Sequence, residues 1–282
     1  MNKINFTKMH GLGNDFVIID NRSQIFIKNS GVIKKICNRK EGIGCDQLIL
    51  IEECQDKLAD VKIRIFNSDG SEVETCGNAT RCVGKIILEG KKTKNILVET
   101  MGGLLDVEKL QENFFSVDMG VVRVDWRDIP LSSPKNVADV GIDLPILKGG
   151  FAVNIGNPHI VFFTEEKNMN MDTISSDCNK ISKMSLFPKG ININIAQVLT
   201  KKTIKLLIYE RGVGFTNACG SGACATLAAA FKLGYTDRDA KIKMPGGQLD
   251  IEYMNDNHIL MSGPVSKSYC GFFEMNFYNN EK

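Results

Sequence analysis

Two short stretches of the chain decide its fold: TCGNATRC at residues 75–82 and ACGSGAC at residues 218–224. In each, a cysteine is followed by glycine and then by small residues, which predicts the beginning of a helix. Cys76 and Cys219 lie 143 residues apart, and the same offset recurs along the chain. It aligns residues 13–14 with residues 156–157, and residues 65–67 with residues 208–210. Residues 102–108 match residues 246–252 at an offset that is one residue longer. A period this long indicates a duplicated domain, because solenoid repeats span roughly 20–50 residues.

The residues around these stretches alternate between apolar and polar, which is the period of a β-strand. Strands are expected over 61–66, 96–100, 104–110, 114–119, 203–209 and 259–261, with hairpin turns at the glycine pairs 102–103 and 246–247. Helices are expected over 78–89 and 222–233, and each is followed by a glycine that can end it in a left-handed conformation. The sequence therefore predicts an α+β fold of two pseudo-symmetric domains, each an antiparallel or mixed sheet wrapped around one central helix. Residues 125–150 contain three prolines and are expected to form the crossover between the halves.

Composition narrows the possible functions. The 282 residues are enough for two domains, and a net charge of +2 gives no reason to expect a nucleic acid or a membrane as partner. The N-terminus lacks a secretory pattern, and nine cysteines are an odd number, so we expect reduced thiols in the cytoplasm. No metal is expected, because the cysteines lack the tight pairing of zinc sites and only three histidines are present.

Cys76 and Cys219 differ from the other cysteines. Each precedes a glycine, which allows a ligand to approach the backbone, and each is expected at a helix N-terminus, where unpaired N–H groups favour anions and lower the pKa of a thiol. The remaining cysteines are interpreted as packing residues: Cys37, Cys45, Cys54, Cys82, Cys178, Cys224 and Cys270.

Two such helix ends facing one cleft could bind a carboxylate and place the adjacent carbon between the two thiols. One thiolate would remove the hydrogen of that carbon, and the other thiol would return a proton on the opposite face. The helix N-termini would stabilise the negative charge that develops on the carboxylate. The sequence thus points to inversion at an α-carbon without a cofactor.

The chain resembles the diaminopimelate epimerase family, whose members convert LL-diaminopimelate to the meso form without a cofactor. The similar segments cover essentially the whole chain: KMHGLGNDF at 8–16, FNSDGSEVETCGN at 66–78, GNPH at 156–159, YERG at 209–212 and CGSGAC at 219–224. The resemblance implies the family's two-domain fold. It places residues 1–120 plus 266–282 in the first domain and 121–265 in the second, with the active site between them.

The resemblance also implies roles for individual residues. Cys76 and Cys219 correspond to the acid–base pair, and His159 and Glu210 to residues that assist their proton transfers. The implied substrate-binding residues are Asn14, Gln47, Asn67, Gly77, Asn78, Asn157, Asn192, Glu210, Arg211, Gly220 and Ser221. Among them Glu210 and Arg211 would hold the distal amino and carboxylate groups. Tyr269 corresponds to a tyrosine at the family's homodimer interface.

Two alternatives stay open at this point. Another two-cysteine racemase of the same fold could act on proline, hydroxyproline or histidine. Asn78 stands where proline racemases typically carry histidine, which argues against proline and hydroxyproline. Glu210 and Arg211 would also have no use on a substrate without a polar distal end. A thiol redox protein is the other alternative, although the sequence has no CxxC redox motif.

Overall fold

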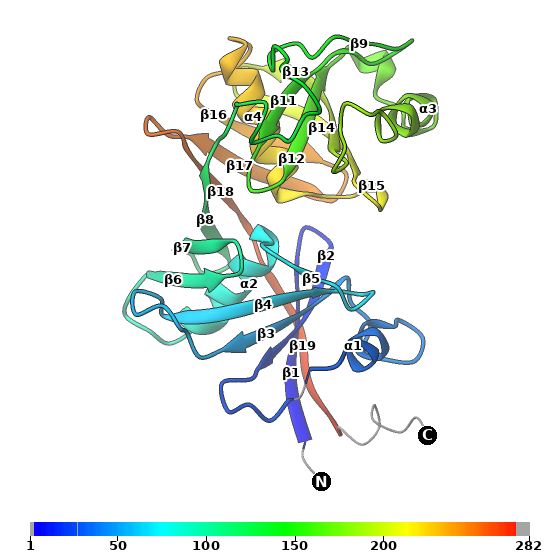
Figure 1. Cartoon of the computed structure of the whole chain (residues 1–282). Helices are drawn as coiled ribbons and strands as arrows, with labels where there is room; N and C mark the ends of the chain where they lie inside the picture. The colour runs from blue at the N-terminus through cyan, green and yellow to red at the C-terminus, as the bar shows by residue number, and fades with distance from the viewer. Residues whose placement is uncertain (1–2, 27, 275–282) are drawn as a thin grey trace. The chain divides into compact units, whose positions relative to one another are not determined.

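A computed structural model describes residues 3–26 and 28–274. They form two compact units: one contains residues up to 117 together with those from 263 onward, and the other contains residues 118–262 (Figure 1). The last residues that the resemblance assigns to the first domain, 275–282, lie outside the described residues.

The described part of the first unit is a mixed sheet with two helices. Its elements are β1 (Lys3–Gly11), β2 (Asn14–Asp20), α1 (Ser30–Cys37), β3 (Gln47–Glu52), β4 (Val61–Asn67), β5 (Glu72–Val73), α2 (Gly77–Leu88), β6 (Asn95–Thr100), β7 (Gly103–Gln111), β8 (Phe114–Val121), which crosses into the second unit, and the late strand β19 (Ser266–Glu274). Although β19 is last in sequence, it pairs antiparallel with β1 along its length (Figure 1).

The second unit begins with the short hairpin β9 (Ile142–Asp143) and β10 (Lys148–Gly149). It continues with β11 (Phe151–Asn154), β12 (Pro158–Phe163), a 3-10 turn η1 (Glu166–Asn168), α3 (Met171–Ile181), β13 (Asn192–Thr200), β14 (Thr203–Glu210), β15 (Gly214–Thr216), α4 (Gly220–Lys232), β16 (Asp239–Met244), β17 (Gly247–Tyr253) and β18 (His258–Pro264).

The strand pairings of the two units repeat each other. β2 is parallel to β3, β3 antiparallel to β4, and β4 parallel to β6, which forms a hairpin with β7. The strands β12, β13, β14, β16 and β17 repeat these four pairings in the same order. The predicted α+β class is confirmed, and the shared pairing pattern is what a duplicated sequence would produce.

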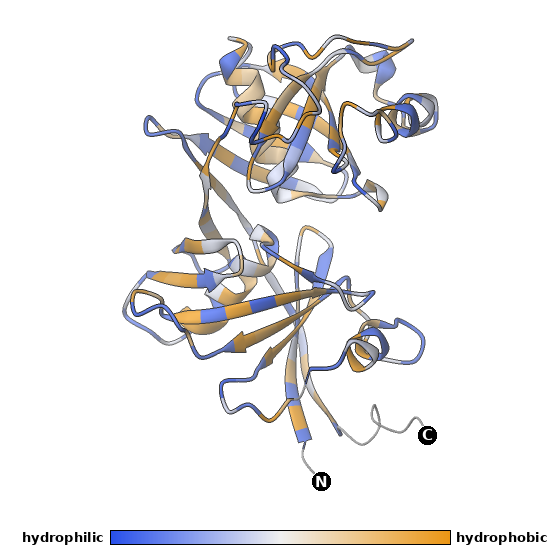
Figure 2. Ribbon diagram, in the orientation of Figure 1, coloured by the Kyte–Doolittle hydropathy of each residue, from blue (hydrophilic) through white to orange (hydrophobic). Residues whose placement is uncertain are grey.

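Each sheet packs around a helix that is buried on most sides. α2 contacts β1, β2, β6 and β7, and α4 contacts the strands β11 to β14, β16 and β17. Gly84 allows the approach of α2 to β7, because a Cβ there would lie 2.6 Å from Val107 Cγ1. The alanines of α4 are fully buried, since small side chains leave room for strands around the helix. Strand β4 alternates hydrophobic and hydrophilic residues, matching its alternating burial (Figure 2).

Two sequence-based expectations are wrong. Residues 125–150 are not a crossover but belong to the second unit, because Ile129, Leu131 and Val140 are buried in its core with α3. Cys270 is not a buried packing residue, since it is exposed on β19. None of the described helices is long and apolar enough to cross a membrane.

Candidate active site

Both cysteines of the duplicated motif occupy the N-cap position of a helix. Cys76 has the extended backbone of an N-cap before α2 (φ −149°, ψ 105°), and Cys219 has the same conformation before α4 (φ −140°, ψ 120°). Neither cysteine side chain caps its own helix by a hydrogen bond. The cysteine side chains therefore leave the N–H groups of the first turn, which begins at Gly77 and at Gly220, uncapped, as an anion site requires.

The first unit gathers amides around Cys76. Cys76 Sγ donates to Asn14 Oδ1 at 3.8 Å, and Asn78 Nδ2 lies 3.4 Å from the same oxygen. The fully buried Arg81 holds Asn78 in place, because its guanidinium donates to Asn78 Oδ1 at 2.6 Å. The structure therefore brings Asn14, Cys76 and Asn78 together.

Two further amides lie where β3 begins and β4 ends. Gln47 and Asn67 are direct partners across these strands, and Gln47 Nε2 donates to Asn67 Oδ1 at 3.0 Å. Asn67 Nδ2 donates to Ser71 Oγ at 3.1 Å, which orients the amide within a turn. Both residues are half-buried, so their amides are held in place while part of each stays exposed.

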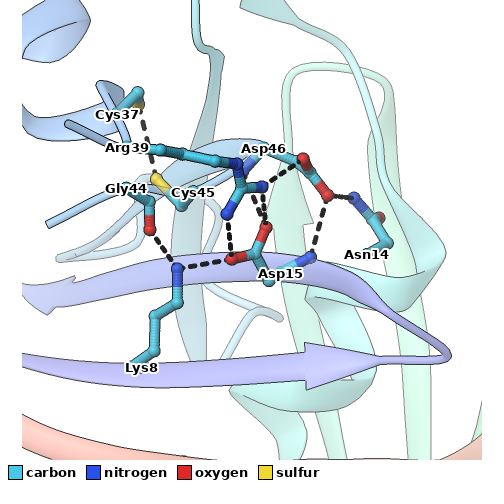
Figure 3. Close-up of polar contacts among 8 residues, drawn as sticks. All are labelled: Lys8, Asn14, Asp15, Cys37, Arg39, Gly44, Cys45 and Asp46. Carbon is cyan, nitrogen blue, oxygen red and sulfur yellow. Dashed lines mark hydrogen bonds and ion pairs between the residues drawn. The ribbon is translucent and has the colours of Figure 1, made fainter.

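Sequence reasoning missed the ionic network that holds Asn14, shown in Figure 3. Asn14 Nδ2 donates to Asp46 Oδ2 at 3.1 Å, and Arg39 joins Asp46 to Asp15 through bonds of 2.7 and 2.6 Å. The buried Lys8 ammonium lies 2.6 Å from Asp15. Burial alone would raise the pKa of Asp15, but the hydrogen bonds and charges of Arg39 and Lys8 outweigh it and hold that pKa well below its usual range. The segment KMHGLGNDF contains three of these residues, Lys8, Asn14 and Asp15, and only its folding shows their pairing with Arg39 and Asp46.

Two cysteines lie beside this network. Cys37 and Cys45 are buried, as expected of packing residues, and their sulfur atoms are 3.4 Å apart (Figure 3). The hydrogen bond between them raises the pKa of the Cys37 thiol.

In the second unit, His159 takes the place that Phe16 has in the first. His159 Nε2 lies 2.8 Å from Asn157 Oδ1 and 3.1 Å from Ser221 Oγ, and Ser221 Oγ lies 3.5 Å from Cys219 Sγ. His159 has no exposed surface. Burial lowers its pKa to about 3, and the charge of Arg211 acts in the same direction, so the imidazole is neutral.

The neighbouring strands supply the remaining predicted residues. Asn192, at the start of β13, donates to Pro158 O at 3.0 Å and accepts from Arg211 N at 3.0 Å. Glu210 ends β14 and is half-buried, while the exposed Arg211 donates to Lys189 O at 2.7 Å. Gly190 makes room for Arg211, since its φ is +70° and a Cβ there would lie 2.6 Å from Arg211 Cδ.

Tyr269 lies apart from these clusters, on β19. It is 48% exposed and contacts Phe6 edge-on, with ring centroids 6.0 Å apart. Together with Phe6, Ile43 and Phe272 it lines a surface groove of about 570 Å³.

Comparison with known proteins places the chain among its relatives. The family model described as diaminopimelate epimerase matches residues 6–124 and 151–268. A diaminopimelate epimerase of Erythrobacter litoralis is 42% identical over 279 residues, covering 98% of this chain and all of the relative. The chain belongs to the diaminopimelate epimerase family. One from Sphingopyxis alaskensis is 43% identical over 94% of this chain and 96% of its own length.

More distant solved structures share the family's fold. A probable proline racemase from Agrobacterium radiobacter has a TM-score of 0.71 at 12% identity and covers 98% of this chain and 94% of its own. A PhzF-family phenazine biosynthesis protein of Bacillus anthracis has a TM-score of 0.68 at 13% identity, with 97% and 100% coverage. The epimerase family therefore shares one duplicated architecture with proteins of very different sequence.

Proposed function

We propose that this protein is a diaminopimelate epimerase, which interconverts LL- and meso-2,6-diaminopimelate by proton transfer at one α-carbon. The observation that carries the proposal is the family membership over nearly the whole chain, combined with a cysteine at the N-cap of each equivalent helix. The reaction is an isomerisation that serves lysine and peptidoglycan precursor biosynthesis.

The proposed mechanism uses two bases and no cofactor. The thiolate of one cysteine removes the α-hydrogen as a proton, and the electron pair spreads onto the α-carboxylate. The thiol of the other cysteine then donates its proton to the opposite face of the carbon. Because this exchanges one thiolate for the other, Cys76 and Cys219 swap protonation states in each turnover.

The surrounding residues are proposed to bind the substrate. Gly77, Asn78, Gly220 and Ser221 belong to the first turns of α2 and α4, whose N–H groups suit the reacting carboxylate as it gains charge. The amides of Asn14, Gln47, Asn67, Asn157 and Asn192 suit a zwitterionic ligand. Glu210 takes the distal ammonium and Arg211 the distal carboxylate, because an arginine fork binds a carboxylate through two parallel hydrogen bonds.

We further propose a cytoplasmic homodimer with Tyr269 in the interface. Tyr269 and Phe272 support this part because they are 48% and 54% exposed and line a surface groove together with Phe6 and Ile43. Light scattering of the wild-type protein and of Tyr269→Lys tests it, with a dimer expected for the first and a shift towards monomer for the second. A wild-type monomer would contradict it.

One assay tests the activity. The protein is incubated with LL-diaminopimelate in D₂O under reducing conditions without added cofactor, and meso product carrying deuterium at one α-carbon is expected. Exchange with proline, hydroxyproline or histidine but not with diaminopimelate would instead support a different racemase.

The same assay addresses the thiol redox alternative. A redox protein would exchange no hydrogen with any amino acid but would reduce a small disulfide substrate. A requirement for pyridoxal phosphate would contradict the two-thiol mechanism.

A further inference from the structure

Asn194 lies directly behind His159 in the second unit, and the resemblance gives it no role. It projects from β13 and has no exposed surface. Its amide nitrogen lies 3.1 Å from His159 Nδ1 and 3.1 Å from the carbonyl oxygen of Ile160. Asn194 thus connects the imidazole to a fixed backbone group.

The Ile160 carbonyl decides which way the amide of Asn194 points. A carbonyl oxygen only accepts, so the group 3.1 Å away must be the NH₂ and not the amide oxygen. The same NH₂ then donates to His159 Nδ1. A reversed amide would place its oxygen at Nδ1, but it would also set two oxygen atoms against each other at Ile160.

The packing of α4 is consistent with this orientation. A Cβ at Gly222 would lie 2.7 Å from Asn194 Oδ1, so only glycine leaves that oxygen its place against the helix. Among the described residues, Asn194 Oδ1 has no hydrogen-bond partner. The amide group of Asn194 is therefore held in place through its NH₂ group. Burying Oδ1 without a hydrogen bond costs free energy, and packing alone does not explain why the residue is an asparagine.

We propose that Asn194 is a positioning residue that keeps His159 in the neutral form with its proton on Nε2. A nitrogen that accepts from Asn194 carries no proton of its own, so the single imidazole proton resides on Nε2. Nε2 then donates towards Asn157 Oδ1 at 2.8 Å and Ser221 Oγ at 3.1 Å.

This arrangement makes His159 a hydrogen-bond donor and not a proton acceptor. Ser221 Oγ, which accepts from His159, can direct its own proton at Cys219 Sγ, 3.5 Å away. A donor so placed favours the thiolate of Cys219 over the thiol. This catalytic consequence rests on the proposed epimerase function, whereas the state of the imidazole does not.

Nitrogen NMR of the wild-type protein tests the imidazole directly. Only three histidines are present, so His10→Gln and His258→Gln assign the remaining signals to His159. The expected result is a protonated Nε2 and an unprotonated Nδ1 that do not titrate between pH 5 and 8. A proton on Nδ1, or titration of His159 in this range, would overturn the inference.

A variant then tests Asn194 itself. In Asn194→Asp the carboxylate accepts from Nδ1, so His159 should carry a proton on Nδ1 and begin to titrate. The value of kcat should fall on the order of tenfold to a hundredfold, with a smaller change in KM, as for residues that orient a functional group. Asn255→Asp adds the same charge at an exposed turn of the same unit and should change neither readout.

The outcomes separate the inference from the proposed function. If Asn194→Asp does not fold, the wild-type NMR spectrum still decides the tautomer. The expected tautomer without epimerisation would contradict the proposed function alone. Epimerisation with a titrating His159 would contradict the inference alone. An unchanged His159 signal in a folded Asn194→Asp protein would also overturn the inference about Asn194.

Discussion

The two units have the same strand pairings but support their thiols differently. In the first unit, Cys76 faces the amide oxygen of Asn14, which accepts a hydrogen bond, and the buried Arg81 holds the neighbouring Asn78. In the second unit, Cys219 faces the hydroxyl of Ser221, which His159 contacts. The two units have therefore kept the same strand pairings and the same cysteine, while the side chains that contact each sulfur atom differ.

The strand register shows where the divergence lies. Phe16 is opposite Gln47 on the parallel pair β2 and β3, and His159 is opposite Asn192 on the equivalent pair β12 and β13. Two residues further along, Ile49 of the first unit corresponds to Asn194 of the second. A buried apolar pair in one unit thus corresponds to a buried polar pair in the other, which suggests that the polar pair is kept for function.

Removal of either thiol is expected to have the largest effect. Cys76→Ser and Cys219→Ser should each reduce epimerisation by about 10²–10⁴-fold or more, because a two-base reaction needs both groups. The measurement is deuterium incorporation from D₂O into product, with Cys270→Ser as the control on an exposed thiol. Full activity in either variant would break the equivalence of the two units.

Replacing one residue pair of the second unit by its counterpart in the first should reduce the rate less than removal of a thiol. The double variant His159→Phe, Asn194→Ile copies the pair Phe16 and Ile49, and kcat should fall roughly tenfold to a hundredfold. The free energy of unfolding should stay the same or increase, because replacing both polar partners by apolar groups is nearly neutral or stabilising. Urea denaturation and steady-state kinetics measure the two. A large loss of stability would show that the polar pair is structural.

Among the described residues, the ionic network of the first unit is not repeated at the equivalent positions of the second, where Pro158 takes the place of Asp15. Asp15→Asn should lower the free energy of unfolding at pH 7 by about 1–3 kcal/mol, since buried Lys8 loses its counter-charge. The folded-state pKa of Asp15 is depressed, so its contribution is present above the unfolded pKa near 4 and lost as pH falls towards the folded value. The difference between the two proteins in denaturation curves should therefore begin to shrink between pH 4 and pH 3. A constant difference would contradict the assignment.

Replacement of the glycines that follow α2 and α4 should have the smallest effect. Gly90 and Gly234 have φ values of +74° and +76°, and a Cβ on either would meet nothing within 4 Å. Alanine at either position should cost about 1 kcal/mol through backbone strain alone. Equal losses in thermal or urea unfolding are expected, and clearly unequal ones would show that the two helix ends are not equivalent.

Sequence alone determined the repeat, the α+β class and both cysteine N-caps. These depend on local patterns, namely an offset that recurs, alternation of apolar residues and small residues after a cysteine. It did not reveal that Ile129 and Leu131 belong to the core of the second unit, because prolines nearby suggested a connection. The pairing of Lys8 and Asp15 with Arg39 also escaped it.

The tertiary structure decided which side chains contact each thiol. Asn192 and Asn194 are the same residue type two positions apart, yet one bonds Pro158 O and Arg211 N and the other bonds His159 and Ile160 O. Contacts between strands depend on register, and a side chain's partners follow from register and not from its neighbours in sequence. The sequence thus determined where two thiols begin two helices. Only the folded strands determined that one sulfur atom faces an amide oxygen and the other a serine hydroxyl.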